Sequence, residues 1–189
     1  MQDLLKLSRA IDRVTGVVGH AVGWLVLASV LVAAGNAILG KLFNLTSNAW
    51  LELRWYLFGA VFMLGAAHTL ERNEHIRIDI LSSHLSKRTR DRIDLLGHLL
   101  ALLPFTLILG VLTSVFFWRS VVSEEVSGSA GGLILWPARL VILAGFVLLL
   151  AQCLSEIIKR IGVMRGLIQD PHDAPPRADD AIAHETLHT

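Results

Sequence analysis

Four long apolar stretches divide this chain, and short polar segments separate them. They cover about residues 14–40, 51–70, 95–118 and 137–158. A helix rises about 1.5 Å per residue, and the hydrocarbon core of a bilayer is about 30 Å thick. Each stretch is therefore long enough, or nearly so, to cross a membrane as a helix. The pattern predicts an all-α integral membrane protein with four transmembrane helices, in a membrane domain of residues 1–165.

The second stretch carries two opposite charges near its start. Glu52 and Arg54 are two residues apart, so on a helix they point roughly 200° apart and cannot pair with each other. The charge-free part that follows, residues 55–70, spans only ~24 Å, which places Arg54 near a membrane boundary. Two uses stay open for each charge: an interfacial position among headgroups, or a buried contact between helices.

Aromatic and basic residues flank the apolar stretches where the membrane interface is expected. Tryptophan and tyrosine rings favour this zone, and an arginine side chain can extend its charge toward it. The expected interfacial anchors are Trp55, Tyr56, Trp118, Trp136 and Arg139.

The two ends of the chain differ from the apolar stretches. Leu4, Leu7, Ile11 and Val14 recur at helical spacing, whereas the charged residues of this segment lie largely elsewhere. This pattern favours a short amphipathic helix on the membrane surface. Residues 166–189 are rich in proline, aspartate, alanine and histidine and have no apolar period, so we expect a disordered cytoplasmic tail.

Single residues add local expectations. Pro104 predicts a kink or a break in the third stretch, because proline cannot donate a helical hydrogen bond. Glu156 lies three residues before Lys159 and four before Arg160, a spacing that favours local ion pairs. Glycines and alanines between residues 59 and 67 offer small surfaces for a close helix contact.

Composition narrows the function further. Of the 189 residues, 53% are hydrophobic, which is unusual for a soluble domain. A lone cysteine, Cys153, excludes an internal disulfide and a Cys-x-x-Cys site, and its apolar surroundings favour a packed hydrophobe. The chain shows no nucleic-acid motif and no separate basic domain, so we do not expect it to bind nucleic acid. We also expect no cofactor.

Basic residues are distributed unevenly between the two sides of the predicted membrane domain. They collect before the first stretch, between the second and third, and after the fourth. The other two loops hold only Lys41 and Arg119 apart from charges at the helix edges. The positive-inside rule then predicts that both termini and the middle loop are cytoplasmic.

Residues 50–81 resemble the small permease subunit of tripartite ATP-independent periplasmic (TRAP) transporters. The similar pieces are Trp50-Leu-Glu-Leu-Arg-Trp-Tyr-Leu-Phe, Leu64-Gly-Ala-Ala, Arg72 and His75-Ile-Arg-Ile-Asp-Ile-Leu. The His-Ile-Arg-x-Asp pattern after the second stretch is the most specific part, and length, span number and cytoplasmic termini agree. Many members carry two adjacent acidic residues where this chain has Glu52-Leu53.

The resemblance implies a membrane transport subunit and not an enzyme. It implies a multi-pass protein of the bacterial inner membrane that braces a large multispanning permease subunit. A periplasmic binding protein would supply a small carboxylate-bearing solute, and a sodium gradient would drive uptake. The solute and sodium sites would lie in the large subunit, and membrane lipids would surround both. The expected partner-contact residues are Trp50, Glu52, Arg54, Arg72, His75, Arg77 and Asp79.

A different class of function competes with transport. His20, His68 and His98 all fall near the cytoplasmic ends of the predicted spans. Two histidines at matched depth in a helical bundle can ligate haem, which would make the chain a membrane cytochrome or redox subunit. The outer half of the predicted spans has no histidine, so a transmembrane path with haem at both faces is disfavoured.

The charge asymmetry yields a direct test of topology. We expect reporter fusions at the C-terminus to report cytoplasm, and fusions near Ser127 to report periplasm. The reverse pattern would refute the predicted orientation.

Overall fold

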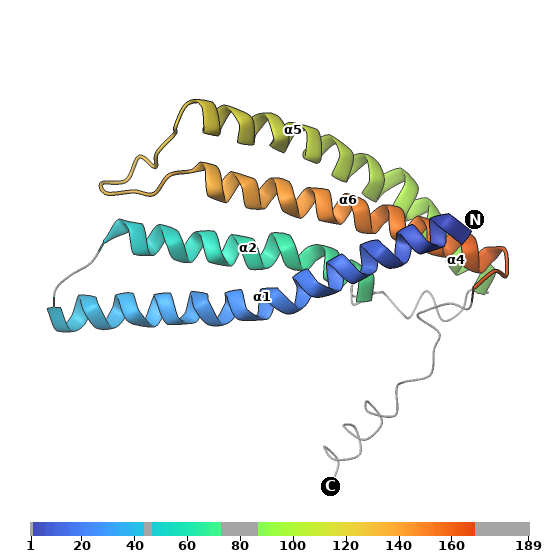
Figure 1. Ribbon diagram of the computed structural model, residues 1–189, viewed down its shortest axis with the longest axis horizontal. Coiled ribbons are helices and arrows are strands. Elements are labelled where there is room, and N and C mark those ends of the chain that lie inside the picture. The colour runs from blue at the N-terminus through green and yellow to red at the C-terminus, as the bar shows by residue number, and fades with distance from the viewer. Residues whose placement is uncertain (1, 44–46, 73–86, 169–189) are drawn as a thin grey trace, which may run out of the picture.

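The computed structural model describes residues 2–43, 47–72 and 87–168, almost all of them helical (Figure 1). The elements are α1 (Gln2–Phe43), α2 (Asn48–Arg72), α4 (Lys87–Gly97), the π-helix η1 (His98–Leu102), α5 (Leu103–Val122) and α6 (Trp136–Met164). Within the described residues, the only β pairing is an isolated antiparallel bridge between Val126 and Ile134. The predicted all-α class is confirmed. Most of the predicted tail lies outside the described residues.

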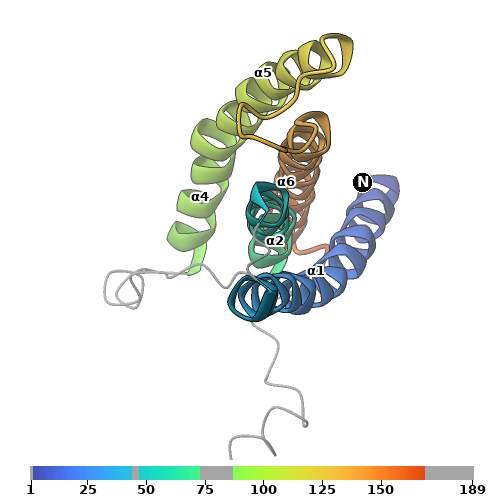
Figure 2. The ribbon, with the colours of Figure 1, turned by 90° about the vertical axis from the view of Figure 1, so that its left-hand side faces the viewer.

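The long helices form an open row and not a closed bundle. Figure 1 shows the order α5, α6, α2 and α1 across the row, and the end-on view of Figure 2 shows α2 between α6 and α1. Helix α6 packs on α1, α2 and α5, whereas α5 makes its main interhelical contact with α6. Many large apolar side chains of the described helices are exposed on the surface of this row.

Within the described parts of the chain, three helical segments are long and apolar enough to cross a membrane: Gln2–Phe43, Thr89–Val122 and Trp136–Met164. They contain the first, third and fourth predicted stretches. The second stretch forms α2, a helix of 25 residues, but charged residues near both of its ends shorten its apolar part. A fourth span therefore stays a prediction.

The structure corrects the prediction of a separate amphipathic helix at the N-terminus. Helix α1 is continuous over 42 residues, ~63 Å at ~1.5 Å per residue, and its N-terminal part crosses α6 (Figure 1). There Ser8 and Thr15 are buried, whereas Leu4 and Leu7 are exposed. Polar contacts with α6 therefore fix this segment, and its apolar residues face outward.

In contrast to a soluble protein, more polar than apolar side chains are buried among the described residues, and many large apolar ones are exposed. Among the described residues, the buried apolar side chains are Ala60, Ala67, Leu70 and Cys153. The buried polar and charged ones are Ser8, Thr15, Asp91, Thr106, Ser120, Gln152, Ser155, Glu156 and Arg160. In a bilayer, large apolar side chains gain little by moving from lipid into protein, so small residues and polar contacts hold the helices together. The prediction that Cys153 is packed is confirmed.

Close approach of α2 and α6 depends on a glycine. A Cβ atom added to Gly145 of α6 would lie 2.8 Å from Cβ and 2.9 Å from the carbonyl oxygen of Met63 on α2. The neighbour is helix backbone, which cannot rotate away. Ala60 and Ala67 of α2 are buried as well, so part of the predicted small-residue surface is used within this chain.

The predicted break near Pro104 is present as a π-helical segment. Residues His98–Leu102 form a π-helix that leads directly into α5, whose first turn contains Pro104. Proline lacks the N–H that would bond four residues back, and a π turn changes the hydrogen-bond register at that point.

We expect Gly145→Ala to lower the free energy of unfolding by about 1–3 kcal/mol, because it overpacks the α2–α6 contact. Gly110→Ala is the control, because a Cβ there meets no atom within 4 Å. Thermal unfolding in mild detergent would compare the two. Equal midpoints for both variants would contradict the tight contact.

Candidate functional site

The two charges near the start of α2 have different surroundings. Glu52 is half-buried, and its Oε2 accepts a hydrogen bond from the Leu133 N–H at 2.7 Å, while its Oε1 accepts one from the Ser127 hydroxyl. Arg54 is exposed, with its guanidinium carbon 6.0 Å from the centre of the Trp55 ring. The predicted divergence of the two side chains is confirmed. Glu52 makes a contact within this chain.

Glu52 holds a hairpin, residues 123–135, that joins α5 to α6. The hairpin closes through the Ser127 N–H and the Leu133 carbonyl at 2.9 Å, and Gly131 supplies a left-handed turn residue with φ of 70°. Asn48 Nδ2 donates to the Ala130 carbonyl at 3.1 Å. The N-terminal end of α2 and the hairpin thus form one hydrogen-bonded unit.

Arg139 makes an internal contact and does not extend outward as predicted. Its guanidinium lies 2.6 Å from Glu125 Oε2 and 3.8 Å from the centre of the Phe116 ring. The Arg139 side chain is only 13% exposed. The ion pair and the cation–π contact tie the base of the hairpin to α5 and α6.

The remaining predicted anchors lie on the outside of the row or close to the hairpin. Trp55, Trp118 and Trp136 are each at least 40% exposed, as rings that meet lipid would be, and so is Trp50, one of the expected partner-contact residues. Tyr56 is half-buried, and its hydroxyl donates to the Ile134 carbonyl at 3.4 Å. Their contact with a membrane interface stays a prediction.

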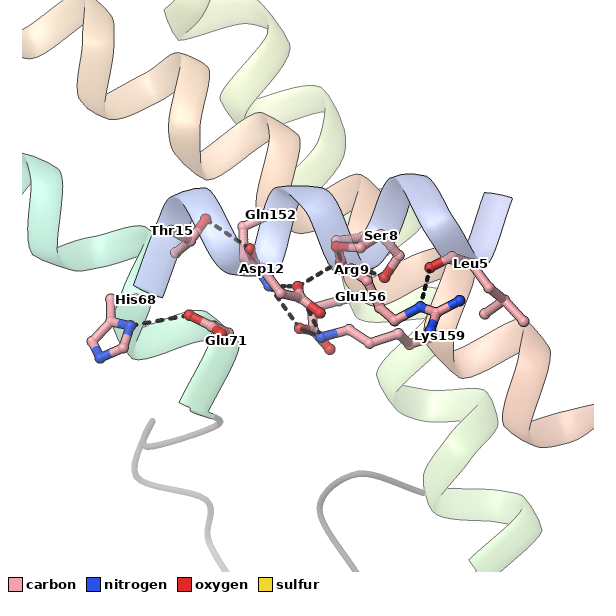
Figure 3. A network of polar contacts seen from close by, with 11 residues as sticks. Leu5, Ser8, Arg9, Asp12, Thr15, His68, Glu71, Gln152, Glu156 and Lys159 are labelled. Atoms are coloured by element: carbon pink, nitrogen blue, oxygen red, sulfur yellow. Dashed lines mark hydrogen bonds and ion pairs between the residues drawn. The ribbon is translucent and has the colours of Figure 1, made fainter. Parts of the chain in front are cut away.

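A buried polar cluster joins the opposite end of the row, and we call it the α1–α6 seam (Figure 3). At its centre, Asp12 Oδ1 accepts hydrogen bonds from Gln152 Nε2 at 2.9 Å and from Ser155 Oγ at 2.8 Å. Lys159 Nζ lies 3.3 Å from the same oxygen and 2.5 Å from Glu156 Oε1. One lysine therefore bridges two carboxylates, one from each helix.

Neutral contacts extend the seam along α1. Thr15 Oγ1 donates to Gln152 Oε1 at 3.0 Å, and the Ser8 and Ser155 hydroxyl oxygens are 2.7 Å apart. All four side chains are almost completely buried. Unpaired polar groups at these positions would be costly, so the two helices fit in one register only.

A second buried ion pair attaches α4 to α6. Arg160 donates from Nη1 to Asp91 Oδ1 at 2.9 Å, and its Nη2 lies 3.2 Å from Asp94 Oδ2. The predicted local pairing of Glu156 with Lys159 is confirmed. Arg160 also reaches across to α4, which sequence spacing did not indicate.

The histidines of the rival hypothesis lie in two places. The His20 and His68 ring centroids are 6.1 Å apart, and His98 lies on η1, with Nδ1 2.7 Å from the Asp94 carbonyl oxygen. The His68 ring packs against Gly19, and its Nδ1 lies 3.0 Å from Glu71 Oε2. Both observations assign His68 a packing role, and nothing in the described structure favours haem.

The specific motif that follows α2 falls outside the described residues. His75, Arg77 and Asp79 therefore have no structural account, and Arg72 lies exposed in the last turn of α2. Their expected role in partner contact stays a prediction.

Sequence reasoning missed the α1–α6 seam, although a signal was present. Ser8, Asp12 and Thr15 are spaced four and three residues apart, so they share one helical face. On α6, Gln152, Ser155, Glu156 and Lys159 repeat the same spacing inside an otherwise apolar helix. Two polar faces of matching period predict that the helices meet there.

These features together define an integral membrane protein whose polar side chains tie helices to one another. Within the described residues, no group of three or more histidine, cysteine, aspartate or glutamate side chains could hold a metal ion.

One family model matches the chain: tripartite ATP-independent periplasmic transporters, DctQ component, over residues 38–162. This match covers more than half of the chain, so the chain belongs to the DctQ family and is a small membrane subunit of a TRAP transporter. The resemblance is thereby confirmed, and the family is a transporter component, not an enzyme family. No match was found among curated proteins or among solved structures.

We expect Asp12→Ala to lower the free energy of unfolding by about 3 kcal/mol, because three donors lose their common acceptor. Asp3→Ala is the matched control, since the Asp3 side chain is 93% exposed and pairs only with exposed Lys6. The readout is thermal unfolding in mild detergent. A midpoint shift no larger for Asp12→Ala than for Asp3→Ala would show that the seam does not stabilise the fold.

We expect Glu52→Ala to release the hairpin without unfolding the helices, because it removes the acceptor of the Leu133 N–H. Hydrogen–deuterium exchange of peptides from residues 123–135 should become faster. Glu124→Ala is the control, because Glu124 is an exposed acidic residue of the same hairpin. Unchanged exchange in the Glu52 variant would mean that other contacts hold the hairpin.

Proposed function

We propose that this chain braces the large permease subunit of a TRAP transporter in the bacterial inner membrane. The large subunit would carry a small organic acid across, driven by a sodium gradient, after a periplasmic binding protein delivers it. The observation that carries the proposal is the DctQ match over residues 38–162, which includes α2, α5 and nearly all of α6.

A brace needs a fixed shape, and three sets of contacts support one. The seam fixes α1 to α6, Arg160 fixes α4 to α6, and Glu52 fixes the hairpin to α2. Helix α6 takes part in the first two and begins where the hairpin ends. Because contacts at both ends of α6 fix the neighbouring helices to it, we expect this subunit to keep its shape while a neighbouring subunit moves.

The polar residues of the α1–α6 seam hold helices together. Asp12 Oδ1 and Glu156 Oε1 both accept from Gln152 and pair with Lys159, so these two oxygens are engaged within the protein. A solute or ion path needs polar groups that are free to bind its cargo. This supports the assignment of the solute and sodium sites to the large subunit.

We also propose that α2 is the fourth span and that both termini are cytoplasmic. Its middle, residues 55–70, is free of charge, and its neighbours α1 and α6 both contain a candidate membrane span. The distribution of lysine and arginine supports the orientation.

The proposed contact with the large subunit uses Arg72, His75, Arg77 and Asp79 at the cytoplasmic end and Trp50 at the other. The most specific similarity to the family lies in His75, Arg77 and Asp79. Charged residues beyond a membrane helix are suited to ion pairs with a partner subunit, because water screens them less at an interface.

We expect Arg77→Glu or Asp79→Lys to reduce solute uptake or recovery of the large subunit, while the variant still inserts in the membrane. The reason is that a like charge would replace an attractive one at the subunit contact. Arg165→Glu is the control, because Arg165 is an exposed cation outside the motif. Uptake and co-purification at wild-type levels in both motif variants would contradict the proposed contact.

A further inference from the structure

Arg54 borders a groove between α1 and α2. The groove has a volume of about 270 Å³ and is lined by Ser29 of α1 and by Arg54, Trp55 and Phe58 of α2. Apart from the guanidinium and one hydroxyl, its lining side chains are aromatic.

The Arg54 charge has no anionic partner among the described residues. The nearest carboxylate in sequence, Glu52, is engaged by the hairpin. Arg54 contacts the Trp55 ring, and no described carboxylate pairs with it. An exposed arginine near the end of a membrane helix can extend its charge to the headgroup region, where phosphates offer a counter-ion.

From Arg54 toward the C-terminus of α2, the helix presents two phenylalanine rings, Phe58 and Phe62, which we call the aromatic track. Phe58 and Phe62 follow at steps of four residues, their ring centroids are 6.3 Å apart, and both are more than half exposed. From Arg54 to Phe62 the track measures ~12 Å at ~1.5 Å per residue. It leads from the charged end of α2 toward the middle of the helix.

We propose that this groove binds one phospholipid, with its phosphate on Arg54 and an acyl chain along Phe58 and Phe62. A cation at one end and an apolar track along the helix match the two parts of a phospholipid. The planar guanidinium can donate two hydrogen bonds to a phosphate, and the track offers aromatic surface to the chain. A carboxylate of a partner subunit would satisfy the charge but would leave the track unexplained.

The test is native mass spectrometry of the full-length chain with its co-purifying proteins, titrated with phosphatidylglycerol. We expect Arg54→Gln to weaken lipid binding about tenfold or more, because the charge-assisted hydrogen bonds are lost. Arg54→Lys should lose less, because it keeps the charge. Ser29→Phe should also weaken binding, because it fills the groove while Arg54 remains.

The matched control is Arg119→Gln, which removes an exposed arginine that does not line the groove. Circular dichroism verifies the helical content of every variant.

Wild-type lipid affinity in Arg54→Gln would overturn the proposal. Loss of a co-purifying protein from Arg54→Gln at unchanged lipid affinity would assign Arg54 to a partner carboxylate instead. Glycerol 3-phosphate that competes as strongly as the lipid would exclude a role for the aromatic track.

Discussion

The carboxylate of Asp12 is the contact on which the arrangement of helices depends. It accepts from Gln152, Ser155 and Lys159 of α6, and it lies on the part of α1 that extends beyond the length of a single membrane crossing. Hydrophobic burial offers little driving force between helices in lipid, so directional polar contacts set their register. Without this acceptor, Gln152, Ser155 and Lys159 would each lose one contact with α1. The crossing of α1 over α6 would then be held by fewer polar contacts, among them Ser8–Ser155 and Thr15–Gln152.

The same constraint explains why the helices lie in an open row. A closed bundle hides its inner face, whereas here small residues line the helix contacts and the large apolar side chains point outward. The exposed apolar side chains of the described helices are available to lipid or to another subunit. An open row of helices suits a DctQ subunit, because we propose that it packs beside a larger permease subunit and holds it in place in the membrane.

Apolar runs predicted the helical class and most helix positions, because hydrophobicity over about twenty residues is a strong signal. The spacing of Glu52 and Arg54 predicted that they diverge, but not that Glu52 bonds to Leu133, eighty-one positions away. Such long-range pairs depend on which helices are neighbours, and periodicity does not reveal that. The amphipathic pattern of the N-terminal segment did not reveal the role of Asp12 for the same reason: it does not tell a face toward water from one toward polar groups of another helix.

The most direct measurement is mild-detergent purification of the tagged chain from its native membrane, with mass spectrometry of the proteins that accompany it. A bracing subunit should carry a large multispanning protein at equal stoichiometry, and the pair should survive conditions that preserve the α1–α6 seam. Recovery of the chain alone from intact membranes, or with a haem absorbance band, would contradict the account.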